Sequence, residues 1–201
     1  MRARLIFIIV IAFSVGVLIA VLIGTGRSPI AVHSGKALIG GPFTLTDQNG
    51  TLVSDSDFRG KYMLVSFGYT YCPDICPAEL NVMSEALKKL GSDAQNIVPI
   101  FITIDPQRDT VEQMANYVSS FHPRMVGLTG TEEQIKEAAG AYRVFYSRAD
   151  GDGAGDSYLM DHSTFMYLMN PKGEYVTHFG YGISADDLAA RLSQAMDDSG
   201  A

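Results

Sequence analysis

The pattern of hydrophobic and polar positions after residue 41 predicts a series of β-strands. An Asn49-Gly50 pair separates two short alternating runs, which is the pattern of a β-hairpin over residues 43–55. Two continuous apolar runs predict buried strands, and three further runs predict strands nearer the C-terminus. These five segments are Tyr62–Phe67, Ile97–Ile104, Arg143–Ser147, and the two arms Ser163–Asn170 and Gly173–Gly180 around a Pro171-Lys172-Gly173 turn.

Four helices are predicted between and after these strands. They run from Pro77 to Leu90, from Thr110 to Ser120, from Thr131 to Gly140, and from Ser184 to Met196. Gly91 is a typical residue to follow a helix, and Thr-x-x-Gln patterns at Thr110 and Thr131 predict capping boxes. Strands that alternate with helices, closed by a hairpin and a last helix, predict one α/β domain over residues 42–201. A central mixed sheet flanked by helices is expected.

An uncharged run of twenty residues, Leu5–Gly24, precedes this domain. As a helix at about 1.5 Å per residue it spans about 30 Å, the hydrocarbon thickness of a bilayer. A cleaved signal peptide usually has a shorter apolar region, so a single uncleaved transmembrane helix is the prediction. Arg2 and Arg4 precede the run and only Arg27 follows it closely, which favours a cytoplasmic N-terminus.

These features are typical of a bacterial inner-membrane protein. Residues 1–4 are expected in the cytoplasm, residues 25–41 form a linker, and the domain lies in the periplasm, where conditions permit a disulfide. The chain has 22 Asp and Glu against 15 Lys and Arg, a formal net charge of −7. An acidic domain of this kind argues against nucleic-acid binding, which requires basic patches.

Both cysteines of the chain, Cys72 and Cys76, lie in FGYTYCPDICPAEL, between a predicted strand and a predicted helix. The partial positive charge of a helix N-terminus favours a thiolate there. Three interpretations compete. A structural disulfide over so short a loop contributes only about 2 kcal/mol. A redox pair usually has the spacing C-x-x-C, one residue shorter. Positions i and i+4 of a regular helix share one face, so both sulfurs would also converge on a metal.

A metal site needs a further ligand, and the chain has four histidines. His33 in the linker, His122 before a proline and His178 on an alternating strand fit solvated or structural roles. His162, in MDHSTF, lies between a loop and an apolar strand, where binding residues are often held. Two thiolates and one imidazole suit Cu(I), whereas zinc requires a fourth ligand. The residues favour copper binding, and a redox pair remains open.

Three segments taken together resemble the Sco/SenC family of copper proteins: FGYTYCPDICPAEL, ITIDPQRDT and MDHSTFMYLMNPKGEYV. The resemblance extends from about Phe43 to the C-terminal helix and includes the anchor. It implies a thioredoxin-like fold with an added β-hairpin, and one copper ion per chain, as Cu(I) or Cu(II). The residues that match the family's ligands are Cys72, Cys76 and His162.

The family's D-x-x-x-D feature matches Asp105 and Asp109. Two interpretations of this pair stay open. They are either ordinary turn and capping residues, or residues that orient the cysteine loop from behind.

The function that the resemblance implies is a metallochaperone for cytochrome c oxidase assembly. It would deliver copper to the binuclear copper site of an oxidase subunit, after loading by an upstream copper donor. The alternative is a thiol-disulfide oxidoreductase that keeps the oxidase's copper-ligand cysteines reduced, with Cys72 and Cys76 as the redox pair. A thiol peroxidase, which shares this general fold, is a weaker third interpretation, because nothing in the sequence identifies a pocket for peroxide.

Overall fold

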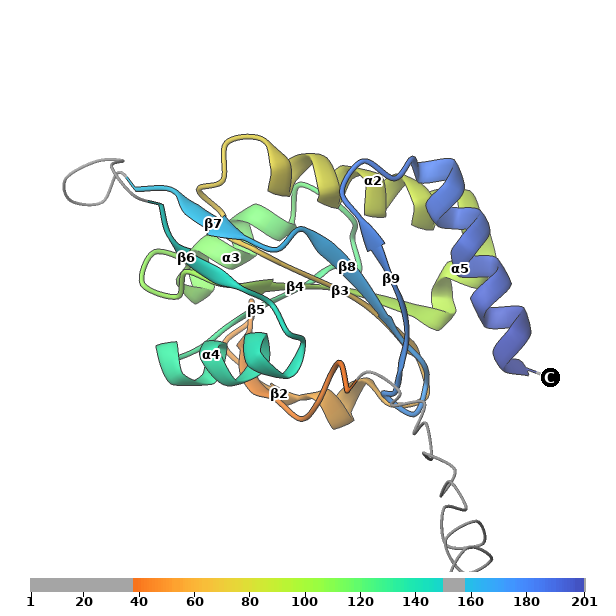
Figure 1. The fold of residues 1–201 in the computed structure, drawn as a ribbon, viewed down its shortest axis with the longest axis horizontal. Helices are drawn as coiled ribbons and strands as arrows, with labels where there is room; N and C mark the ends of the chain where they lie inside the picture. The colour runs from red at the N-terminus through yellow and green to blue at the C-terminus, as the bar shows by residue number, and fades with distance from the viewer. Residues whose placement is uncertain (1–37, 150–157, 201) are drawn as a thin grey trace, which may run out of the picture. The chain divides into compact units, whose positions relative to one another are not determined.

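A computed structural model describes residues 38–149 and 158–200 of the chain. Their centre is a seven-stranded mixed sheet in the order β2-β1-β5-β4-β3-β8-β9 (Figure 1). Neighbouring strands β3, β4 and β5 are parallel, and the remaining pairs are antiparallel. The strands are β1 Thr44–Asp47, β2 Leu52–Ser54, β3 Tyr62–Gly68, β4 Ile97–Thr103, β5 Val126–Thr129, β8 Phe165–Met169 and β9 Tyr175–Gly180. A separate two-stranded sheet pairs β6 Tyr146–Arg148 with β7 Met160–His162.

In the described part of the chain, α-helices cover both faces of the large sheet (Figure 1). They are α2 Ile75–Leu90, α3 Val111–Val118, α4 Glu132–Ala141 and α5 Ala185–Gly200, with short 3-10 helices η1 Asp55–Phe58 and η2 Gly91–Asn96. Most buried side chains of α2 and those of α3 and α5 join one apolar cluster, and those of α4 join the cluster on the other face, to which Cys76 of α2 also belongs. Successive residues of β3, such as Leu64 and Val65, point into opposite clusters because side chains alternate along a strand.

The predicted mixed sheet flanked by helices is confirmed, and so is the hairpin around Asn49-Gly50. The pattern does not predict β5, because its four residues include Gly127 and follow a proline-containing turn. A Cβ atom on Gly127 would lie 2.8 Å from a methyl carbon of Val118, so the missing side chain lets α3 pack on the strand. The strand expected at Arg143–Ser147 begins three residues later, as β6, and its partner β7 is also unpredicted.

No helix of the described residues is both long and apolar enough to cross a membrane. The predicted anchor Leu5–Gly24, the cytoplasmic residues 1–4, His33 and most of the linker lie outside the described residues.

Candidate functional site

The cysteine segment begins at the carboxyl end of β3, beside the carboxyl ends of the parallel strands β4 and β5. This edge of an open α/β sheet is where such folds usually bind ligands. Gly68, the last residue of β3, makes room for Cys76. A Cβ atom on Gly68 would lie 2.7 Å from the Cys76 sulfur and 2.8 Å from a ring carbon of Phe101. The sulfur therefore packs directly on the strand's backbone.

The two cysteines lie on either side of the start of α2. The helix begins at Ile75, two residues earlier than predicted, so Cys76 is in its first turn and Cys72 is in the loop before it. The two cysteines therefore do not share a face of one regular helix. The sulfurs are brought together differently: the backbone N–H of Cys76 donates to Sγ of Cys72 over 3.4 Å. The Asp74 side chain at the N-cap position accepts no capping hydrogen bond.

His162, at the end of β7, is the third group of the site. Its Nε2 atom lies 3.4 Å from Sγ of Cys76, although 86 positions separate the two residues in the chain. Its Nδ1 atom lies 2.9 Å from the carbonyl oxygen of Ser163. Because a carbonyl only accepts, Nδ1 carries a proton, so Nε2 is the nitrogen left to bind a metal when the ring is neutral. This is how proteins commonly orient a metal-binding imidazole.

Tyr69 supports this histidine from the cysteine loop. Its ring meets the ring of His162 edge-on, with centroids 6.2 Å apart. Its hydroxyl oxygen accepts the backbone N–H of Met160 over 3.2 Å, which ties β7 to the residue that follows β3.

The thiols differ strongly in acidity. The hydrogen bond from the Cys76 side chain lowers the pKa of Cys72 to about 3, helped by His162 and by the N–H groups of Asp74 and Cys76, against the effect of burial. The same hydrogen bond, together with burial, raises the pKa of Cys76. Burial works to lower the pKa of His162, but its bonds to Cys72 and Ser163 outweigh burial and raise it. At neutral pH the site thus holds one accessible thiolate and one buried thiol.

Asp109 fixes the loop that precedes Cys72 through hydrogen bonds to Thr70. It is fully buried, and its carboxylate accepts the Thr70 N–H (3.0 Å), the Thr70 hydroxyl (2.6 Å) and the Thr103 hydroxyl (2.6 Å). Burial above all raises its pKa. Gln113 donates its side-chain N–H to the Thr70 hydroxyl over 2.9 Å, so the capping box predicted at Thr110 is only half formed. Two groups thus fix Thr70, two residues before Cys72.

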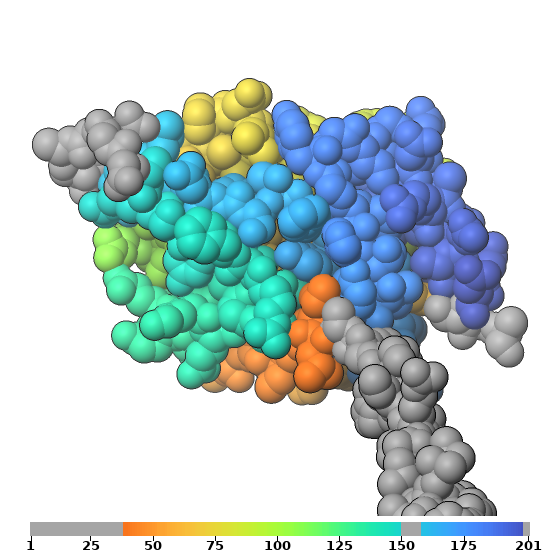
Figure 2. Space-filling model, in the orientation of Figure 1, coloured from red at the N-terminus to blue at the C-terminus, as the bar shows by residue number. Residues whose placement is uncertain are grey.

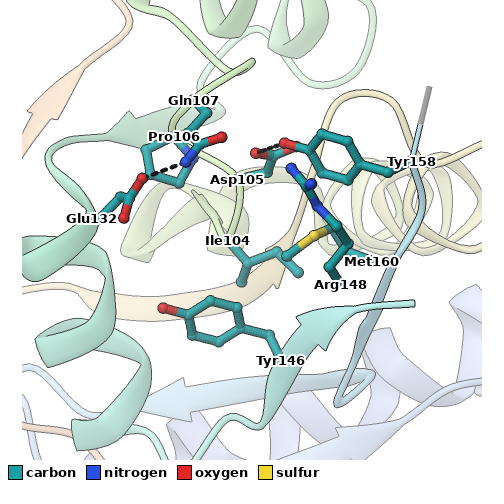
Figure 3. Close-up of a pocket in the computed structure, with 9 residues that line it drawn as sticks. All are labelled: Ile104, Asp105, Pro106, Gln107, Glu132, Tyr146, Arg148, Tyr158 and Met160. Atoms are coloured by element: carbon teal, nitrogen blue, oxygen red, sulfur yellow. Dashed lines mark hydrogen bonds between the residues drawn. The ribbon is translucent and has the colours of Figure 1, made fainter. Parts of the chain in front are cut away.

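Asp105 belongs to a neighbouring network with Arg108 and Tyr158. The Tyr158 hydroxyl donates to its Oδ1 atom over 2.7 Å, and Nε of Arg108 donates to Oδ2 over 2.5 Å. The Arg108 guanidinium also lies over the rings of Tyr158 and Tyr71, 3.6 and 4.8 Å from their centroids. Asp105 and Tyr158 line a pocket of about 380 Å³ beside the β6–β7 sheet (Figure 3). Asp105 is thus linked to the cysteine loop indirectly, because it bonds to Arg108 and Arg108 contacts Tyr71.

Cys72 and His162 line a second pocket, of about 330 Å³, which shares Met160 with the first. Among the described residues, no three His, Cys, Asp or Glu side chains are arranged as they would be around a metal ion. The donor set nevertheless fits a soft metal. Ligands about 2.3 Å (sulfur) and 2.1 Å (nitrogen) from one ion lie about 3.6–3.8 Å apart at tetrahedral to trigonal angles. The 3.4 Å between Cys76 Sγ and His162 Nε2 is close to that. A metal would replace the hydrogen bonds among these side chains.

The sequence matches SCO1/SenC over residues 31–197. This chain belongs to the SCO1/SenC family. It is 40% identical over 190 residues to an SCO2-like protein of Rickettsia prowazekii (strain Madrid E), covering 92% of this chain and 93% of that protein. The crystal structure of Arabidopsis thaliana ScoI with copper bound is 40% identical with a TM-score of 0.75, covering 80% of this chain and 99% of ScoI.

A more distant solved structure, that of BsSco, has a similar fold. BsSco is described as a member of the Sco family of cytochrome c oxidase assembly proteins. It is 24% identical with a TM-score of 0.62, covering 80% of this chain and 94% of BsSco. The thioredoxin-like fold expected from the resemblance is confirmed for the described domain. The two other histidines of the described residues have other contacts: His122 accepts the Arg124 N–H, and His178 contacts the Tyr175 hydroxyl.

The sequence motifs of this SCO1/SenC chain do not single out Arg108, Tyr158 or Glu79. Arg108 lies within ITIDPQRDT, between Asp105 and Asp109. Its position in this motif could have indicated a role at the site. Glu79 stands one helical turn after Cys76, on a face that the apolar pattern predicts to be buried. It is 6% exposed. Burial above all raises its pKa to about 7, against the attraction of His162.

Proposed function

We propose that this SCO1/SenC chain is a copper metallochaperone. It binds one copper ion through Cys72, Cys76 and His162 and delivers it to the binuclear copper site of cytochrome c oxidase during assembly. The observation that carries the proposal is the placement of His162 Nε2 at 3.4 Å from the Cys76 sulfur, with Nδ1 held by a carbonyl. The copper-bound Arabidopsis relative supports copper as the metal.

The cellular setting is part of the same proposal. The uncharged run Leu5–Gly24 anchors the chain in a bacterial inner membrane, and the arginines before it favour a cytoplasmic N-terminus. The domain then works in the periplasm, close to a membrane-bound oxidase. An upstream donor supplies the copper.

Transfer proceeds by exchange of ligands, one at a time. Cys72 is partly exposed while Cys76 is 2% exposed, so a receiving thiolate approaches the ion from the side of Cys72. His162 is the ligand most readily lost, because a proton competes with the metal for Nε2. The buried Cys76 sulfur is the last donor group to let go.

The test is copper stoichiometry on the reduced, anaerobic protein beside the variant His162→Ala. One copper per chain in the wild type, with affinity reduced by orders of magnitude in the variant, supports the three-ligand site. Equal copper in both proteins, or none in either, contradicts it.

One observation favours a second function, the thiol-disulfide oxidoreductase. Cys72 is a partly exposed thiol with a pKa of about 3 and Cys76 a buried one with a raised pKa, the division between an attacking and a resolving cysteine. Cys72 attacks a partner disulfide and displaces one partner thiolate. Cys76 then attacks Cys72, releases the second partner thiol and leaves a Cys72–Cys76 disulfide. A dithiol reductant returns the pair to the reduced form.

The two functions separate in the same His162→Ala variant. The oxidoreductase needs no imidazole, so disulfide exchange with a model peptide disulfide should persist at a rate within a few fold of wild type. Loss of exchange together with loss of copper would contradict an independent redox function.

A further inference from the structure

Exposed apolar side chains gather around the candidate site. The described residues include eight large apolar side chains that are exposed, and six of them belong to segments that adjoin Cys72, His162 or the start of α2. Large exposed apolar patches usually mark a surface that another protein covers. The six are Tyr71, Ile75, Phe145, Leu159, Phe165 and Tyr181, and the two elsewhere are Leu38 and Leu52.

A separate pocket opens next to this surface, between the first turns of α2 and the loop that follows β9. Its volume is about 250 Å³. Ala78, one helical turn after the exposed Ile75, forms part of its wall, and the exposed Tyr181 lies at its rim. The start of α2 and the segment after β9 adjoin at the top of Figure 2. The remaining wall is formed by Val82, Met166, Gly180, Gly182 and Ile183, with Glu79.

Among the described residues that line this pocket, Glu79 is the only charged one. It is 6% exposed, and its Oε1 atom is buried without a hydrogen-bond partner among the described residues. Leaving a buried acceptor unpaired costs about 1–3 kcal/mol, more for a charged group. The neighbouring wall residues are apolar or glycines, so nothing in the pocket compensates for that cost. A ligand that brings a hydrogen-bond donor would.

We propose that this pocket receives the side chain of a lysine or arginine from the protein that docks on the exposed apolar surface. The aliphatic part would lie against Val82, Met166 and Ile183, and the cationic end would bond to Glu79. That partner is the oxidase subunit that receives the copper, and for its identity the proposal rests on the proposed function. Asp74 and Asp161, both exposed beside Cys72 and His162, also favour a partner with basic residues around its apolar surface.

Other occupants fit the pocket less well. Small-molecule sites usually measure about 300–1,000 Å³, so 250 Å³ suits a single side chain better. A hard cation such as Ca²⁺ needs about six to eight oxygen ligands, and this pocket offers one carboxylate. Soft copper prefers several thiolate, thioether or imidazole ligands, and here Met166 is alone.

The experiment is an NMR titration of the metal-free, reduced full chain with two blocked tripeptides. Acetyl-Gly-Lys-Gly-amide carries the ammonium, and acetyl-Gly-norleucine-Gly-amide carries the same aliphatic chain without charge. We expect the lysine peptide to shift the backbone amide signals of Val82, Gly180 and Gly182 in a saturable way. Its affinity should be at least about tenfold higher than that of the norleucine peptide, because a hydrogen bond to a charged group contributes about that factor.

Variants locate the effect. Glu79→Gln should weaken the lysine peptide about tenfold or more. The matched control Glu85→Gln removes an exposed carboxylate from the same helix, one that pairs with Lys88, and should leave affinity within twofold. Val82→Phe fills the pocket without touching the carboxylate and should abolish binding even if Glu79→Gln fails to fold.

Equal affinity for the two peptides, no saturable shift, or wild-type affinity in Glu79→Gln or Val82→Phe would each overturn the proposal. Copper plays no part in this measurement, so its failure leaves the proposed copper site untouched.

Discussion

Two helices of this protein follow parallel strands of the same sheet and begin in different ways. At α4, the Thr131 hydroxyl accepts the Gln134 N–H over 3.3 Å, and the Gln134 side chain accepts the Thr131 N–H over 2.8 Å. At α2, the N-cap side chain makes no such bond, and the Cys76 N–H is directed at the Cys72 sulfur. The first arrangement is a complete capping box, and the second leaves the helix terminus available to a reactive group.

The free backbone N–H groups at the two helix starts stabilise different chemical groups. Free N–H groups and the helix dipole favour negative charge, and at α4 the two capping oxygens and the first-turn carboxylates of Glu132 and Glu133 take that place. At α2 a thiolate takes it, and buried Asp109 holds the preceding loop through Thr70. A stable helix start and a reactive thiolate thus use the same backbone groups. Substitutions at the two termini should therefore have opposite consequences for metal binding and for stability.

Cys72→Ser tests this contrast most strongly, because it gives α2 an oxygen cap like that of α4. The serine hydroxyl can accept the Cys76 N–H, so the free energy of unfolding should change by less than about 1 kcal/mol. Loss of a residue that only hydrogen-bonds to a metal ligand typically lowers metal affinity ~10–100-fold. Loss of the ligand Cys72 should lower copper affinity by more than that. A competition titration with a copper chelator and a thermal melt measure the two effects. Retained affinity would show that Cys72 serves only as a cap.

The acidity of Cys72 predicts the pH dependence of its alkylation. With a pKa of about 3, Cys72 stays a thiolate from pH 5 to 7, so its rate with iodoacetamide should be nearly constant. A thiol of ordinary pKa, about 8.5, slows about 100-fold over the same range. Mass spectrometry of the alkylated peptides gives the two rates separately. If Cys72 slows in parallel with a free thiol, the hydrogen bonds from the Cys76 side chain, His162 and the backbone N–H groups do not hold it as a thiolate.

Copper affinity should depend on pH in two stages. Cys76, whose pKa is raised, must release its proton to bind copper at every pH tested, which weakens affinity about tenfold per unit of acidification. The pKa of His162 is also raised, and below it a second proton competes at Nε2. The slope should then steepen to about a hundredfold per unit. In His162→Ala the steepening should vanish, and a single slope in the wild type would argue against His162 as a ligand.

Thr131→Ala gives the smallest effect and completes the contrast. Loss of a threonine N-cap costs about 1 kcal/mol of stability, within a usual range of about 0.5–2 kcal/mol. Urea unfolding should show that loss, while copper affinity stays within twofold of wild type. A change in copper affinity would mean that the start of α4 is coupled to the site.

The sequence predicts most of the sheet and its helices because long apolar runs such as Ile97–Ile104 leave little ambiguity. It misses β5 and β7, whose three or four residues are set by tertiary pairing and not by a local pattern. The resemblance to Sco/SenC directs attention to Cys72, Cys76 and His162, and the structure brings all three together. Glu79 is missed because its burial follows from the packing of α2 beside the loop after β9, which no local pattern specifies.

Cys76 and His162 are 86 positions apart in the chain, so an ion held by both would join two distant segments. Binding to the folded state alone raises stability by mass action, about 4 kcal/mol when the free ligand is a thousandfold above its dissociation constant. Proteases cleave the opened state, so a loaded carrier should outlive an empty one. Proteolysis would then remove metal-free molecules faster than metal-bound ones. The molecules that persist longest would be those that still hold the ion.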